Sequence, residues 1–217
     1  MFILLGSLFL AFASTGCNYI VMANYALEGT GKTPAEHALE PWETLVFIDD
    51  PANILPRTVL RANLAEEIST QLVTRQLVPL TVEPTDAMAM VRSRERRGDR
   101  MSMEQIAKEA DVPQLIFIEM ESFSLTESEW VPRPNASCLI KVLDFEQGRR
   151  VYPQGDIGDY GGRRISVSMR EISPESMRST SGRRQAELNL VSRLARDIVK
   201  LFYEYETKDL GENLGTR

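Results

Sequence analysis

Two short apolar runs constrain the fold most, because each fits a strand that is buried on both faces. They occupy residues 44–48 and 115–118, and such continuous runs are typical of parallel strands covered by helices. The chain between them carries apolar residues every four positions. These residues are Leu60, Leu64, Ile68 and Leu72. This spacing predicts an amphipathic helix, and a helix between the two runs predicts a parallel pair joined by a crossover.

The remaining segments predict a sheet that continues in antiparallel fashion. Further strands are expected at residues 77–82, 137–145, 149–152 and 165–169. Helices are expected at residues 84–91, 102–110 and 188–205. The order β-α-β-α-α-β-β-β-α predicts an α/β fold of the mixed α+β kind, with one mixed sheet of about five strands covered by helices. The last helix is expected to be long.

The chain begins with an apolar run that is too short for a membrane span. Residues 1–16 end in Ser14, Thr15 and Gly16, directly before Cys17, whereas a span needs ~20 apolar residues. The run is typical of a secretion signal, although residues 1–16 contain no Lys or Arg, whereas a signal normally opens with positive charge. The alternative is a buried N-terminal element of a cytoplasmic protein. That alternative is disfavoured because the run is apolar on every face.

Small residues before a cysteine resemble the lipobox of bacterial lipoproteins. The resemblance implies cleavage before Cys17, with acyl chains on its sulfur and on the new amino terminus. It also implies a location in the cell envelope, with the chain tethered to a membrane and facing the periplasm or the exterior. The expected organisation has four parts. They are a signal peptide at 1–16, a lipidated tether at 17–42, a mixed α/β domain at 43–206 and a polar tail at 207–217.

Charge, cysteine and histidine content weigh against several functions. A formal net charge of -6 argues against a general nucleic-acid binder. Cys138, the only cysteine besides Cys17, lies in an apolar run and is expected to be a small buried hydrophobe. The only histidine, His37, falls in the expected tether, so no Ser-His-Asp arrangement and no His and Cys metal cluster is predicted. No cofactor is expected.

The tether also contains an incomplete phosphate-binding loop at residues 29–33. This segment fits the end of the pattern G-x-x-x-x-G-K-[ST], but Ala26 stands where the first glycine is required. Pro34 follows the segment, whereas the loop needs a helix whose N-terminus points at phosphate. Nucleotide binding is therefore not expected.

Acidic residues leave a metal-dependent hydrolase as an alternative. Asp49 and Asp50 follow the first strand, and Glu119 and Glu121 would share one face of another. Two carboxylates there could approach Asp144 and bind a metal or exchange protons. A turn and a solvated strand end explain the same residues more simply. No catalytic residue is therefore predicted.

Two loops carry residue types that are common at protein interfaces. The residues are Trp130 and Arg133 in one loop and Tyr160, Arg163 and Arg164 in the other. Aromatic residues and arginine are enriched at interface anchors, so both loops are expected to contact a protein partner. The arginines between residues 92 and 100 are expected to form a solvated helix face, with contact to an anionic partner as the alternative.

The order of strands and helices also resembles a group of bacterial envelope proteins over about residues 43–205. The resemblance rests on residues 45–49 as first strand, 112–119 as central strand, and 143–145 with Gly148 as a hairpin. The group includes the curli secretion lipoprotein CsgG, the penicillin-binding-protein activator LpoB and the N-terminal domain of TolB. It implies a non-enzymatic protein that binds an envelope partner in scaffolding, cell-wall synthase regulation, or secretion and transport. A lipid-transport accessory lipoprotein, which needs an apolar cavity, is a further alternative, and the oligomeric state stays open.

Overall fold

The computed structural model describes residues 31–95, 101–128 and 131–206. The expected signal peptide, Cys17, Trp130 and the polar tail lie outside these residues. Within them, no helix combines the length and the hydropathy that a membrane span requires. The chain divides into two compact units, one of residues 36–203 and one that joins segments from the two ends of the chain.

The smaller unit contains a two-stranded antiparallel sheet. Strand β1 (Lys32–Thr33) pairs with β7 (Tyr205–Glu206). Lys32 Nζ also lies 2.9 Å from Glu204 Oε1 in an exposed ion pair. The last two residues of the incomplete phosphate-binding pattern therefore form a strand and do not begin a helix.

The larger unit is built on a five-stranded mixed sheet. Its strands are β2 (Thr44–Asp49), β3 (Gln114–Ser124), β4 (Asn135–Asp144), β5 (Arg149–Tyr152) and β6 (Arg163–Ser168). The order is β2-β3-β4-β5, and β6 pairs with the other half of the β4 edge. Only β2 and β3 are parallel. The expected fold class, a single mixed sheet in an α+β unit, is confirmed.

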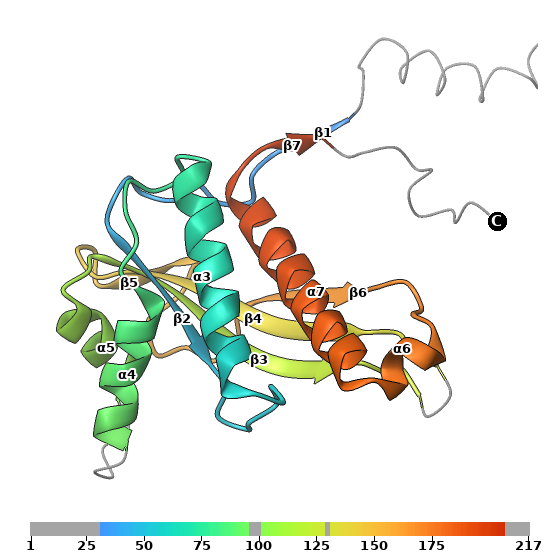
Figure 1. The fold of residues 1–217 in the computed structure, drawn as a ribbon. Helices are drawn as coiled ribbons and strands as arrows, with labels where there is room; N and C mark the ends of the chain where they lie inside the picture. Colours follow the sequence, from blue (N-terminus) through green and yellow to red (C-terminus); the bar gives the residue numbers. More distant parts are fainter. Residues whose placement is uncertain (1–30, 96–100, 129–130, 207–217) are drawn as a thin grey trace, which may run out of the picture. The chain divides into compact units, whose positions relative to one another are not determined.

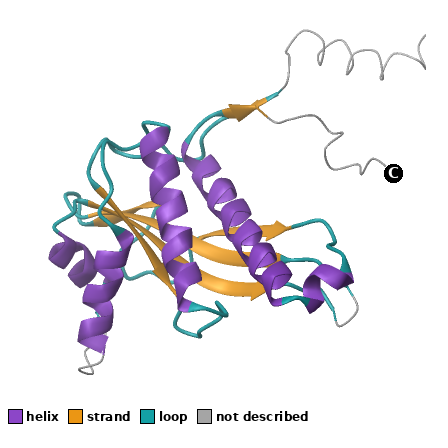
Figure 2. Cartoon of the chain, in the orientation of Figure 1, coloured by secondary structure: helices purple, strands orange, loops and turns teal. Residues whose placement is uncertain are grey.

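Helices cover this sheet (Figures 1 and 2). They are α3 (Thr58–Thr74), α4 (Pro84–Glu95), α5 (Met103–Ala110), α6 (Pro174–Arg178), α7 (Thr180–Val199) and the 3-10 turn η1 (Lys200–Phe202). Helices α3 and α7 lie side by side across one face of the sheet. The long C-terminal helix begins at Thr180, earlier than expected, because the Ser179 side chain caps it by accepting the Gly182 N–H at 2.9 Å.

Residues 77–82 do not form the expected strand. Thr81 makes only an isolated bridge to Thr44 of β2. The Leu77 N–H is already bonded to the Leu72 carbonyl at the end of α3, and Pro79 has no N–H to donate. Pairing is therefore limited to two bonds beside Thr81. The Thr44 N–H donates to the Leu80 carbonyl, and the Val82 N–H donates to the Thr44 carbonyl.

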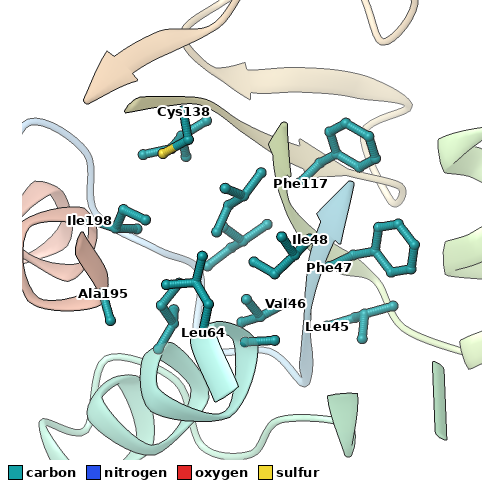
Figure 3. Close-up of a cluster of buried hydrophobic side chains, with 14 of the residues drawn as sticks. Leu45, Val46, Phe47, Ile48, Leu64, Phe117, Cys138, Ala195 and Ile198 are labelled. Carbon is teal, nitrogen blue, oxygen red and sulfur yellow. The ribbon is translucent and has the colours of Figure 1, made fainter. Parts of the chain in front are cut away.

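The main core lies between the sheet and helices α3 and α7. Figure 3 shows Val46 and Ile48 of β2 on the same side as Leu64 and Ile198 of these helices. Cys138 of β4 is buried in this layer, as expected, and burial raises the pKa of its thiol to about 12. A thiol with so high a pKa stays protonated at neutral pH, so it behaves as a hydrophobe.

Two aromatic rings lie on the opposite face of the sheet. Phe47 of β2 and Phe117 of β3 are register partners whose rings stack at 6.0 Å, with 19° between their planes. Side chains alternate between faces along a strand, so both rings point away from Val46 and Ile48 (Figure 3). Helices α4 and α5 pack on β2 and β3 at this end of the sheet.

Candidate functional site

The segment that joins β5 to β6, residues 153–162, carries the most exposed aromatic side chain among the described residues. We call this segment the Tyr160 loop. The ring of Tyr160 is fully exposed to solvent. Tyr160 was expected to be a contact residue, and the structure places it three residues before Arg163, the first residue of β6.

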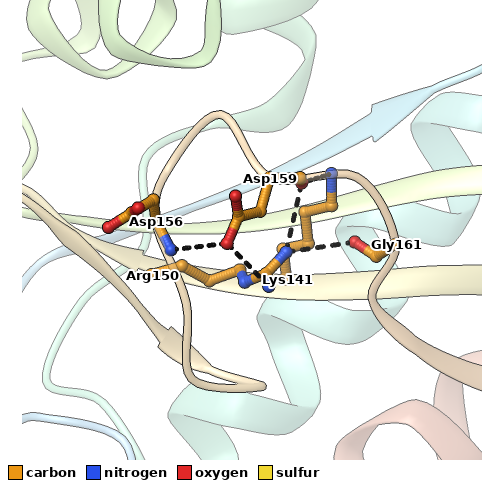
Figure 4. A network of polar contacts seen from close by, with 5 residues as sticks. All are labelled: Lys141, Arg150, Asp156, Asp159 and Gly161. Carbon is orange, nitrogen blue, oxygen red and sulfur yellow. Dashed lines mark hydrogen bonds and ion pairs between the residues drawn. The ribbon is translucent and has the colours of Figure 1, made fainter.

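Two buried cations hold the Tyr160 loop from beneath (Figure 4). Lys141 Nζ donates to the Asp159 carbonyl at 3.2 Å, and Arg150 donates to the carbonyls of Asp159 and Gly161 at 3.2 and 3.3 Å. Each cationic residue is only 7% exposed. A buried charge is costly unless it is hydrogen-bonded, so opening the loop would leave both cations without these acceptors.

The loop is also fixed by its own backbone and by one carboxylate. The N–H and carbonyl groups of Arg150 and Gly155 bond to each other at 3.1 and 3.2 Å. Asp159 Oδ2 accepts the Asp156 N–H at 2.9 Å and lies 3.8 Å from the Arg150 guanidinium. At the end of the loop, a Cβ on Gly162 would lie 2.8 Å from the Ile140 carbonyl oxygen. Only glycine allows the chain to pass so close to β4.

Both arginines that follow the loop are paired with carboxylates. Arg163 forms a two-bond pair with Glu36, at 2.8 Å from Nε and 2.7 Å from Nη2. The Tyr152 hydroxyl donates to the same carboxylate at 2.6 Å. Arg164 Nε donates to Glu121 at 2.7 Å, although its side chain stays 65% exposed. The pairs fix the orientation of the arginines and leave part of each guanidinium at the surface.

The larger unit begins at Glu36, within the segment that the sequence assigns to the tether. The N–H groups of Glu36 and His37 both donate to the Leu201 carbonyl, at 2.8 and 3.0 Å. The His37 ring stacks on Tyr152 at 5.2 Å and meets the edge of Phe202. Burial lowers the pKa of His37. Its role in the structure is therefore packing.

The Glu36 pair makes stability depend on acidity. The hydrogen bond from Arg163 and that from Tyr152 hold the pKa of Glu36 at about 2, below its usual 4.5. Because the folded pKa is lower, the pair stabilises the fold above about pH 4.5, and this stabilisation is lost as the pH falls toward about 2. Melting temperatures measured from pH 6 to pH 2 should fall less steeply for Glu36→Gln than for the wild type. Parallel curves would contradict this prediction.

The second predicted contact loop is described only in part, because Trp130 lies outside the described residues. Arg133 is placed, and its guanidinium lies 2.8 Å from Glu127 Oε2 in an exposed ion pair. Arg163 and Arg164 thus pair with different carboxylates, Glu36 and Glu121, and the role of both loops as partner contacts stays a prediction.

The acidic residues do not assemble as the metal-dependent alternative requires. Asp144 faces Gln114 across the β3–β4 pair, five positions from Glu119. At about 3.3 Å per residue, this separates the carboxylates by about 16 Å along the strand, so the expected approach of Glu119 and Glu121 to Asp144 is wrong. In the described part of the chain, no group of three or more His, Cys, Asp and Glu residues could hold a metal ion.

Asp50 has a structural role at the end of β2. Its carboxylate accepts the N–H groups of Ile54 at 2.7 Å and Leu55 at 3.1 Å. Arg61 of α3 lies 3.3 Å from the same carboxylate. The carboxylate therefore closes the turn that leads into α3.

A pocket of about 350 Å³ lies beside the two stacked phenylalanines, and the sequence analysis did not identify it. Its lining residues come from both strands, from α3, α4 and α5, and from the Tyr160 loop. They are Phe47, Asp49, Thr58, Arg61, Met88, Val91, Arg92, Met101, Ser102, Met103, Glu104, Ile106, Phe117 and Gly158. The lipid-transport alternative needs an apolar cavity, whereas the lining of this pocket combines apolar side chains with polar and charged ones.

Comparisons with known proteins find partial similarity to solved structures only. No family model and no curated protein matches the chain. Solved structures with partial similarity include the hypothetical protein CT253 of Chlamydia trachomatis, with 20% identity, 72% of this chain and 93% of that chain covered, and a TM-score of 0.41. Lipoprotein GNA1162 of Neisseria meningitidis has 14% identity, 73% and 99% coverage and a TM-score of 0.39.

The PelC dodecamer of Paraburkholderia phytofirmans is a third such structure, with 10% identity, 79% and 94% coverage and a TM-score of 0.43. The similar structures thus include bacterial lipoproteins. The narrower resemblance to the CsgG, LpoB and TolB group stays a prediction.

Proposed function

We propose that this chain is a membrane-anchored envelope lipoprotein whose α/β unit binds a protein partner through the Tyr160 loop. The anchor is the acylated Cys17, and the signal peptide at residues 1–16 directs the chain out of the cytoplasm. Partner binding is supported above all by one observation, the fully exposed Tyr160 ring on a loop that Lys141 and Arg150 hold from beneath.

The surface around Tyr160 has the anatomy of a small interface. Its centre is a large amphipathic ring, which gains hydrophobic free energy when a partner covers it. Arg163 and Arg164 follow the loop in sequence as the first residues of β6, and each is oriented by its carboxylate partner. Since the loop is already ordered by hydrogen bonds, binding costs less conformational entropy than it would for a mobile loop.

Site-specific photocrosslinking tests the proposal. Benzoyl-phenylalanine is placed at position 160 of the full-length chain in native envelopes, and the same residue at Val59, 48% exposed on α3, serves as the control. Position 160 is expected to give one protein adduct of defined mass that the Val59 position does not give. Adducts with lipid alone, or the same adducts from both positions, would contradict the proposal.

A second variant links the adduct to the geometry of the loop. Arg150→Met keeps a long side chain in the buried site but removes the donors to the Asp159 and Gly161 carbonyls. The yield of the adduct from position 160 should fall about tenfold, which corresponds to the loss of one interface anchor. Far-UV circular dichroism and a melting curve check that the variant folds. An unchanged yield would show that the buried cations do not hold the loop for binding.

A further inference from the structure

The lining of the pocket beside Phe47 and Phe117 combines apolar side chains with polar and charged ones, and the apolar ones offer contact to a hydrocarbon chain. The two stacked rings form its floor, and both are at least nine-tenths buried. Met88 and Val91 of α4 and Ile106 of α5 form its buried walls. A dry apolar cavity of about 150 Å³ can hold benzene. A pocket of about 350 Å³ therefore has room for one hydrocarbon chain of moderate length.

Two more methionines extend the apolar lining toward the surface. Met101 and Met103 are half-buried and lie at the start of α5. The methionine side chain is unbranched and polarizable, and it adapts to ligands of irregular shape. The lining is thus better suited to a flexible chain than to a rigid ring.

Charged side chains of both signs surround the pocket. Arg61 is held by the Asp50 carboxylate at 3.3 Å. Arg92 is exposed, its Nε donates to the Met88 carbonyl at 3.2 Å, and no carboxylate among the described residues forms an ion pair with it. Glu104 lies exposed in the first turn of α5. The Arg92 guanidinium and the Glu104 carboxylate together complement a head group that carries both a negative and a positive charge.

We propose that this pocket binds a single-chain zwitterionic amphiphile of the lysophospholipid type. The acyl chain packs on Phe47 and Phe117 and between the methionines. The phosphate faces Arg92, and the ammonium group faces Glu104. The proposal does not rest on the partner proposed for Tyr160, although Gly158 of the Tyr160 loop belongs to the lining of the pocket.

Direct binding to the full mature chain tests the apolar part of the site. Lauroyl lysophosphatidylethanolamine, added below its critical micelle concentration, should form a one-to-one complex in isothermal titration and in native mass spectrometry. Met103→Trp fills the pocket and should weaken binding at least about tenfold. Val73→Trp on α3, 38% exposed and outside the lining, should bind as the wild type does. No binding, or equal binding by Met103→Trp, would overturn the proposal.

Head-group variants test the charged part. Arg92→Gln should weaken lysophospholipid binding about tenfold, as expected for a hydrogen-bonded charge pair. Arg196→Gln, which removes an exposed cation from α7, should leave binding unchanged. Laurate and dodecyltrimethylammonium, which carry one charge each, should bind more weakly than the zwitterion. Equal affinity for all three amphiphiles, or no effect of Arg92→Gln, would overturn the assignment of the head group.

Discussion

Replacing Cys17 with serine is expected to move the protein from the membrane fraction to the soluble fraction. Serine has no sulfur for the thioether bond, so neither acyl chain would be added. Each buried CH₂ of an acyl chain contributes about 0.8 kcal/mol to membrane affinity, and two chains give stable anchoring where one does not. Fractionation of envelopes after a carbonate wash, followed by immunoblotting, measures the change.

The control for this experiment is the other cysteine of the chain. Cys138 is buried in β4, so Cys138→Ala should leave the protein in the membrane fraction. Mass spectrometry of the natively produced protein should also find residues 1–16 removed and acyl chains on Cys17. An unprocessed amino terminus with an unmodified thiol at Cys17 would contradict both the anchor and the proposed location in the envelope.

Replacing Ile118 with alanine is expected to lower the free energy of unfolding by about 3 to 4 kcal/mol. Ile118 is fully buried in β3, with Ile48 and Ile140 as register partners on the two neighbouring strands. The substitution removes three carbons from the centre of the core and leaves a cavity that these neighbours cannot fill. Such a loss is a large part of the 5 to 15 kcal/mol that is typical of folded domains.

Urea unfolding measures this effect, with Val59→Ala as the matched control. Val59 is 48% exposed on α3, so its replacement should change stability by less than about 0.5 kcal/mol. A shift for Ile118→Ala as small as that of Val59→Ala would mean that β3 is not the central strand of the core.

Those parts of the fold that depend on local signals could be predicted from the sequence. The apolar runs at residues 44–48 and 115–118 predicted strands buried on both faces, and the structure has β2 and β3 there. The strand predicted at residues 77–82 was wrong. Their apolar composition fits a strand, but two of the backbone N–H groups that a strand would need are not available for pairing. Leu77 closes α3, and Pro79 has no donor.

The candidate site was only half visible, because its residues come from distant parts of the chain. Tyr160, Arg163 and Arg164 could be identified by residue type. The carboxylates of Glu36 and Glu121, which orient the two arginines, are distant in sequence. Lys141 was visible as the single charge within the apolar run of residues 138–143. That signal could have identified a buried cation with a bonding role, although not the loop that it holds.

The pocket could not be predicted, because it exists only where α4 and α5 meet the sheet beside Phe47 and Phe117. Met88 and Met103, which line it, fit the apolar stripe of an ordinary amphipathic helix. Whether such a stripe is packed by the core or faces a cavity depends on how closely the helix approaches the sheet, which no local pattern specifies.

The two proposed binding sites share Gly158, which lies in the Tyr160 loop and also lines the pocket. An amphiphile that shifts this residue on entering would alter the affinity of the loop for its partner. By thermodynamic linkage, the partner would then alter the affinity for the amphiphile by the same factor.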